Sequence, residues 1–191
     1  VESGTWTAAN VMELGAPMIA ARLDGCEGKL ARDATHAPIV VPTVIEDDAL
    51  AARGRTQLLA SRAARAAEAE WRANDREGDW RESEFTSVST RIVRHPTTNE
   101  TWVSAHARIE EGCGAPDINI WGLYRVVGST LVAVQERNLG ELWSIDQLVD
   151  LEGDGTLELV GAPWLENDVV IVRANGDEVS RLELPFFGCA C

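Results

Sequence analysis

The chain has 191 residues, of which 45% are hydrophobic and 25% are charged, so it is long enough and apolar enough to bury a core. Its net charge of −14 argues against a nucleic-acid partner, which requires a basic surface. The sequence contains no apolar run of about 18 residues, the minimum for a membrane-spanning helix, so we expect no membrane span. Lys29 is the only lysine, and this preference for arginine indicates a bacterial genome of high GC content.

Four cysteines are spread along the chain, and this pattern is typical of long-range disulfides in an oxidising compartment. We therefore expect a secreted or cell-envelope protein, in the periplasm or on the outer surface. A bond between Cys189 and Cys191 would be strained, so these two are expected to pair with Cys26 and Cys113 in an order that the sequence does not define. Free thiols and a four-cysteine zinc site are the alternatives, although the chain has no CxxC pair.

Residues 1–76 are expected to form irregular strands followed by one long helix. Val11–Leu23 and the β-branched runs at 39–41 and 43–45 are interrupted by glycine and proline. Asp47–Asn74 is dominated by alanine, leucine, arginine and glutamate, and Asp47 can cap its start, so it predicts a single helix. Its arginines either offer a docking face to an acidic partner or make contacts within the molecule.

From residue 77 to residue 191 the pattern changes to that of an antiparallel β domain. Apolar and polar residues alternate in Phe85–Arg94 and in Thr101–Ile109, and the loop at 95–100 joins them as a hairpin. The sequence thus predicts an α+β fold, in which a β-rich antiparallel sheet domain packs against one long helix as one compact unit. Further strands are expected at Ile118–Val127, Leu131–Glu136, Ile145–Asp150, Leu157–Val160, Val169–Arg173 and Val179–Leu184.

The most informative stretch is a nine-residue acidic loop, Asp150–Glu158, with glycines at its fourth and sixth positions. Alternate residues of a tight loop point inward together, so this spacing can gather several oxygen ligands around one calcium ion. We expect the carboxylates of Asp150, Glu152, Asp154 and Glu158 and the carbonyl oxygen of Thr156 to be the ligands. A dissociation constant of roughly 0.1–1 mM is typical of extracellular calcium modules. The alternative is an acidic turn that binds nothing.

The segment from about residue 139 to residue 175 resembles one FG-GAP repeat, the calcium-binding unit of integrin-α-type propellers and of many bacterial secreted proteins. Leu139-Gly140 stands in the position of the Phe-Gly pair, the acidic loop follows, and Gly161-Ala162-Pro163 completes the motif before an outgoing strand at 169–172. The resemblance implies Ca²⁺ bound by Asp150, Glu152, Asp154, Thr156 and Glu158. The chain is too short for a whole propeller, so we expect one calcium hairpin within a different β-rich domain.

Catalytic motifs are absent from the sequence: it has no G-x-S-x-G, H-E-x-x-H, Walker or G-x-G-x-x-G pattern. Of the seven tryptophans, most are expected to fill the core, and Trp164 is the best candidate for exposure to a glycan. We expect a non-enzymatic, extracytoplasmic, calcium-stabilised module that binds a protein or a glycan. The alternative is a secreted hydrolase or accessory domain whose active site has no recognisable motif.

Overall fold

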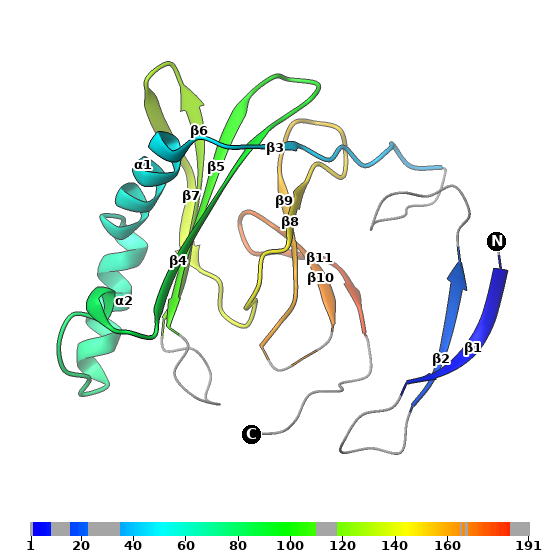
Figure 1. Cartoon of the computed structure of the whole chain (residues 1–191), viewed down its shortest axis with the longest axis horizontal. Coiled ribbons are helices and arrows are strands. Elements are labelled where there is room, and N and C mark those ends of the chain that lie inside the picture. The colour runs from blue at the N-terminus through cyan, green and yellow to red at the C-terminus, as the bar shows by residue number, and fades with distance from the viewer. Residues whose placement is uncertain are drawn as a thin grey trace.

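A computed structural model shows that the protein is built as three layers that lie side by side (Figure 1). Two helices cover one face of a five-stranded antiparallel sheet, and a smaller four-stranded sheet packs against its other face. The structure describes residues 2–8, 16–22, 35–109, 118–164, 166 and 168–183. All four cysteines lie outside these ranges, so the predicted disulfides stay a prediction.

The five-stranded sheet has the order β3-β4-β5-β6-β7, and every neighbouring pair in it is antiparallel. The alternating hydrophobic pattern of residues 85–138 therefore predicts this part of the fold well. A register shift between Leu123 and Tyr124 marks a bulge where β6 meets the edge strand β7. The strands are β3 (Thr43–Ile45), β4 (Thr86–Arg94), β5 (Thr101–Ile109), β6 (Asn119–Val127) and β7 (Thr130–Asn138).

The central strand β5 is buried on both of its faces, because the sheet is covered on both sides. Val103, Ala105, Ala107 and Ile109 point toward the helices and belong to one core. Trp102 points the other way and belongs to the core shared with the smaller sheet. The small alanine side chains let the helices approach the sheet closely.

The single helix expected over Asp47–Asn74 is wrong, because the segment forms two helices. These are α1 (Asp48–Leu59) and α2 (Arg62–Ala73). Ser61 has an extended backbone, and its hydroxyl oxygen accepts a hydrogen bond from the Ala64 N–H at 3.0 Å, so it caps the start of α2. The break lets α1 lie over β4 and β5 while α2 lies over β6 and β7 (Figure 1).

Several arginines of the helical segment make contacts within the molecule. Arg53 donates a hydrogen bond to the Ser129 carbonyl oxygen, and Arg65 donates one to the Ala60 carbonyl oxygen. Arg72 pairs with Glu68 one turn earlier on the same helix. A 3-10 helix at Trp80–Glu82, labelled η1 here, brings Arg81 to the same glutamate, so this carboxylate links α2 to the chain that enters β4.

The smaller sheet has the order β11-β10-β9-β8 and is also antiparallel. Leu148, Leu157, Leu159 and Val170 form its contribution to the second core, where they meet Trp121 and other residues of the large sheet. The bounds of these strands in the sequence agree closely with the predicted ones. They are β8 (Gln147–Val149), β9 (Glu158–Gly161), β10 (Val169–Arg173) and β11 (Glu178–Leu182).

The N-terminal ranges form a separate antiparallel pair. Strands β1 (Glu2–Ala8) and β2 (Ala16–Arg22) pair with each other along their whole length. Among the helices that the structure describes, none has the length and apolar character needed to cross a membrane.

Candidate functional site

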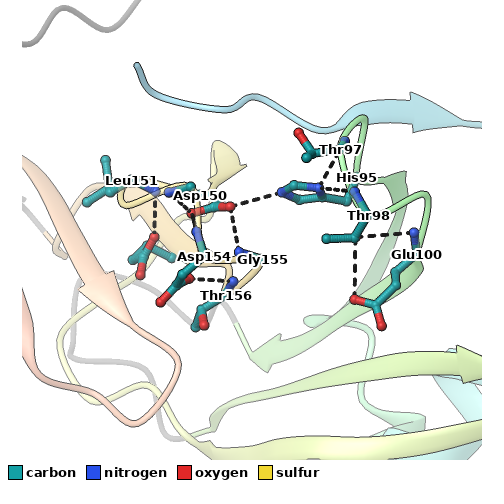
Figure 2. Close-up of polar contacts among 11 residues, drawn as sticks. His95, Thr97, Thr98, Glu100, Asp150, Leu151, Asp154, Gly155 and Thr156 are labelled. Carbon is teal, nitrogen blue, oxygen red and sulfur yellow. Dashed lines mark hydrogen bonds and ion pairs between the residues drawn. The ribbon is translucent and has the colours of Figure 1, made fainter. Parts of the chain in front are cut away.

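The acidic loop connects β8 to β9 at the edge of the small sheet, next to the hairpin loop that joins β4 to β5 (Figure 2). Strand pairing of Val149 with Glu158 closes the base of the loop. The backbone of Asp150 also pairs with Val40, through an N–H to carbonyl hydrogen bond in each direction, at 2.9 and 2.8 Å. The first residue of the loop is therefore held from two sides by backbone pairing.

The carboxylate of Asp150 is fully buried and organises the loop around itself. One oxygen, Oδ1, accepts hydrogen bonds from the Gly153 N–H at 2.6 Å and from the Asp154 N–H at 3.2 Å. The other, Oδ2, accepts from the Gly155 N–H at 2.8 Å. Gly153 and Gly155 have φ angles of 73° and 86°, a region that glycine adopts without strain, so these two residues let the backbone wrap around the carboxylate.

His95 completes the shell of donors around Asp150 from the other side of the site. Its Nε2 lies 3.0 Å from Asp150 Oδ2, and the two side chains are 1% and 0% exposed. Its Nδ1 accepts a hydrogen bond from the Thr98 N–H at 3.1 Å, which places the ring proton on Nε2, where it is donated to Asp150. Figure 2 shows this hydrogen bond joining the two loops.

The same contacts determine the acidity of Asp150. Burial acts to raise the pKa of this carboxyl group, because it disfavours the charged form. The hydrogen bonds from Gly155, His95, Gly153 and Asp154 outweigh burial and hold the pKa of Asp150 below its usual value. Asp150 is therefore a stable buried carboxylate rather than a proton donor.

The other predicted ligands differ in position. Glu158 is buried, and its Oε2 accepts a hydrogen bond from the Leu151 N–H at 3.0 Å; burial raises the pKa of this carboxyl group. Asp154 is exposed, and its Oδ1 accepts from the Thr156 N–H at 2.8 Å. Glu152 and Thr156 are exposed at the surface of the loop. The loop thus brings Asp150, Asp154 and Glu158 near one another through backbone N–H groups.

The positions of these side chains determine whether the loop, as it stands, can hold the predicted calcium ion. Within the described part of the chain, no three histidine, cysteine or acidic side chains are arranged to hold a metal ion. Both oxygens of Asp150 already accept hydrogen bonds, and Glu158 is turned toward the Leu151 N–H. In the described conformation the residues do not fit a preformed calcium site, and calcium binding would require Asp150 and Glu158 to exchange hydrogen bonds for the metal. The calcium site stays a prediction.

A groove of about 280 Å³ lies directly beside the loop. Trp102, Leu123 and Leu157 are buried residues that form its floor. Its polar rim comes from the β4–β5 hairpin, from β6 and from the acidic loop. The rim residues are Thr98, Glu100, Arg125, Asp154 and Thr156, and Arg125 pairs with Glu100 at 3.1 Å.

A second buried histidine, His106, also has a structural partner. His106 Nε2 lies 2.7 Å from Asn119 Oδ1, and the Asn119 amide donates to the carbonyl oxygens of Gly140 and Leu142. This network ties the large sheet to the connection that leads into the small one.

The tryptophans divide into core residues and one surface pair. Trp164 is half-buried rather than exposed, and its ring packs edge-to-face on Trp143 with 4.3 Å between the ring centroids. Arg108 lies over the Trp143 ring, with its guanidinium carbon 4.3 Å from the ring centroid. The side chain of Trp6 lies outside the described part, and the four buried tryptophans are Trp71, Trp80, Trp102 and Trp121.

The sequence did not identify His95, the residue that most directly supports the loop. It stands 55 positions before Asp150 in a stretch whose composition indicates only a hairpin loop. No local pattern relates the two residues, so only the packing of the two sheets reveals the pair.

Comparison with known proteins gives no further assignment: no family model, no curated protein and no solved structure matches the chain.

Proposed function

We propose that this protein is a non-enzymatic, extracytoplasmic binding module whose ligand groove lies between the acidic loop and the β4–β5 hairpin. The observation that carries the proposal is the groove itself, in which an apolar floor is surrounded by charged and hydroxyl side chains from three separate elements. Binding pockets commonly have this composition, an apolar lining with a few polar groups that fix orientation.

The buried acid–base pair supports binding rather than catalysis at this position. A general acid or base must reach the substrate within hydrogen-bond distance. His95 and Asp150 are 1% and 0% exposed, and both the ring nitrogens and the carboxylate oxygens already have partners. Their arrangement suits a role in holding the two loops that form the rim of the groove.

Of the two ligand classes, a protein segment fits the groove better than a glycan. Sugar rings stack on exposed aromatic faces, whereas Trp102 on the groove floor is only 6% exposed. An apolar side chain of a partner can instead contact Val134, which also lines the groove and is 46% exposed. Because the protein carries a net charge of −14 and Asp154 and Glu100 stand on the rim, a partner with nearby lysine or arginine is favoured.

Selection of binders from a random peptide library displayed on phage tests this function. We expect enriched sequences with an apolar residue flanked by lysine or arginine. Thr156→Trp places a large ring at the exposed rim and should abolish the binding. Thr43→Trp is the matched control and should bind normally. Thr43 is an exposed threonine on β3, an edge strand of the large sheet, and it does not line the groove.

Failure to enrich any sequence, or equal binding by both variants, would refute the proposed groove. Binding to a glycan array that Thr156→Trp abolishes would show that the groove is right and the ligand class is wrong. Calcium binding forms a separate part of the proposal, supported by the spacing of the acidic residues in the sequence.

A further inference from the structure

The guanidinium group of Arg137, near the end of β7, contacts the neighbouring small sheet. The group lies against Gly176, in the turn between β10 and β11. A Cβ atom at Gly176 would be only 2.5 Å from Arg137 Nη1, so a larger residue there would collide with the guanidinium. Gly176 also has a φ of 106°, which other residues rarely adopt.

Arg137 has no anionic partner among the described residues. Its Nε is buried without a hydrogen-bond partner, and its one hydrogen bond is a long contact of 3.5 Å from Nη1 to the Asn138 carbonyl oxygen. Burial lowers the pKa of Arg137, and the nearby Asp177 opposes this effect only through space. Burying part of a cation without a counter-charge is unfavourable, so this position is suited to an external anion.

Two acidic residues near this position, Asp177 and Glu178, have other hydrogen bonds. Glu178 accepts from Arg181, with Nη2 of the arginine at 2.9 Å. Asp177 accepts from the Asn175 side-chain amide at 2.8 Å. These contacts engage both carboxylates, and neither of them makes a hydrogen bond or an ion pair with Arg137 among the described residues.

A cavity of about 190 Å³ adjoins the guanidinium, with Arg137 and Gly176 in its wall and with Arg181, Glu141 and Glu178 as the other charged residues of its lining. Its apolar lining comes from Leu139, Leu142, Val170 and Val172, which are buried residues of the second core. For comparison, an apolar cavity of about 150 Å³ in another protein holds benzene. The cavity therefore has room for an apolar group about the size of one ring, next to a cation.

We propose that this cavity binds a small monocarboxylate, with its apolar part against the leucines and valines and its carboxylate on Arg137. The planar guanidinium can donate two parallel hydrogen bonds to a carboxylate, a geometry that lysine lacks. The site is separate from the groove beside the acidic loop, and it shares no lining residue with it.

Benzoate is the probe, and isothermal titration calorimetry is the first measurement. Benzoate should bind, whereas benzamide, which has the same ring without the charge, should bind at least about tenfold more weakly. Inorganic phosphate should also bind more weakly, because it lacks an apolar part. Arg137→Gln should weaken benzoate binding by about tenfold or more, and Arg137→Lys should be intermediate. Arg94→Gln, which removes an exposed arginine that lines neither this cavity nor the groove, should leave benzoate binding unchanged.

A second readout uses the unmodified protein and so does not depend on whether a variant folds. In an NMR titration, benzoate should shift the Arg137 Nε–H and the Gly176 amide resonances, while the amide of Gly78, an exposed glycine that does not line the cavity, should not move. The proposal is overturned if those two resonances do not move, if phosphate or benzamide binds as well as benzoate, or if Arg137→Gln, shown to be folded by its unfolding midpoint, binds benzoate like the wild type.

Discussion

His95 donates a hydrogen bond to Asp150 across 3.0 Å, and this buried contact joins the hairpin of the large sheet to the acidic loop of the small one. Each partner is also fixed by its own loop, His95 through Thr98 and Asp150 through three backbone N–H groups. Together with the shared core, this contact fixes the relative position of the two sheets at the groove.

Removing the imidazole should destabilise the protein. We expect His95→Ala to lower the free energy of unfolding by about 1 to 3 kcal/mol, because Asp150 loses a donor that water cannot replace in a closed site. Urea denaturation at neutral pH measures this change. His36→Ala, at an exposed histidine, is the matched control and should alter the free energy by less than about 0.5 kcal/mol. Equal effects of the two substitutions would contradict a structural role for His95.

The stability should depend on pH through Asp150. Its folded-state pKa is held below the usual value near 3.8, so its contribution is fully present above that pH and is lost as the pH falls through the folded-state pKa. Asp150→Asn should be about 1 to 3 kcal/mol less stable at neutral pH, since an amide nitrogen must face a donor. Urea denaturation across the acidic range should show this difference shrinking.

Glu158 has the opposite effect on how stability depends on pH, because its folded-state pKa is raised. Its contribution to stability is present below the unfolded-state pKa and is lost as the pH rises through the folded-state pKa. The charge of Asp150 is one cause of the raised pKa of Glu158, so Asp150→Asn also reduces this opposing contribution. Asp146→Asn, at an exposed residue before the loop, serves as the control. A difference for Asp150→Asn that stays constant down to strongly acidic pH would contradict the prediction.

Calcium should stabilise the protein if the loop exchanges its internal hydrogen bonds for the metal. At a calcium concentration ten to a hundred times the dissociation constant, we expect a gain of about 1 to 3 kcal/mol over protein in chelator. Thermal unfolding measures the gain, and magnesium at the same concentration is the ionic control. Asp154→Asn should remove the gain, whereas Asp146→Asn should keep it. An unchanged midpoint at millimolar calcium would refute calcium binding.

The close approach of α1 to the sheet can be tested at Gly54. A Cβ atom there would lie 2.5 Å from Val103 Cγ1 on β5. Although alanine usually favours a helix over glycine, Gly54→Ala should destabilise the protein by about 1 to 3 kcal/mol through this overlap. Val103→Ala should partly restore stability in the double variant, relative to the sum of the single changes. Additive losses in a double-mutant cycle would contradict the contact.

Local patterns predict the strands but not the relations between them. The alternation in Phe85–Arg94 and Thr101–Ile109 indicates β4 and β5 because a strand's side chains point to opposite faces in turn. The break at Ser61 is missed because strong helix formers on both sides conceal a single capping residue. Nothing local indicates that Gly176, in the turn before β11, lies against the guanidinium of Arg137.

The site is predicted in outline only. The spacing of Asp150–Glu158 predicts oxygen ligands gathered around a calcium ion, whereas the structure shows backbone N–H groups of the loop gathered around the carboxylate of Asp150. The spacing does not show that backbone N–H groups and an imidazole satisfy that carboxylate, because His95 arrives from another hairpin. A composition rich in acidic residues is compatible with either a metal or protein donors, and the choice depends on tertiary packing.

The pairing of Val40 with Asp150 has a consequence for the order of folding. These residues are separated by both helices and by the entire large sheet, so their pairing closes a very long stretch of chain. Contacts between such distant residues are slow to form, because the entropy of a large loop is lost before the contact is gained. We expect the acidic loop to lock into place after the large sheet has formed. Substitutions at Val40, His95 or Asp150 should then chiefly accelerate unfolding and leave the folding rate nearly unchanged.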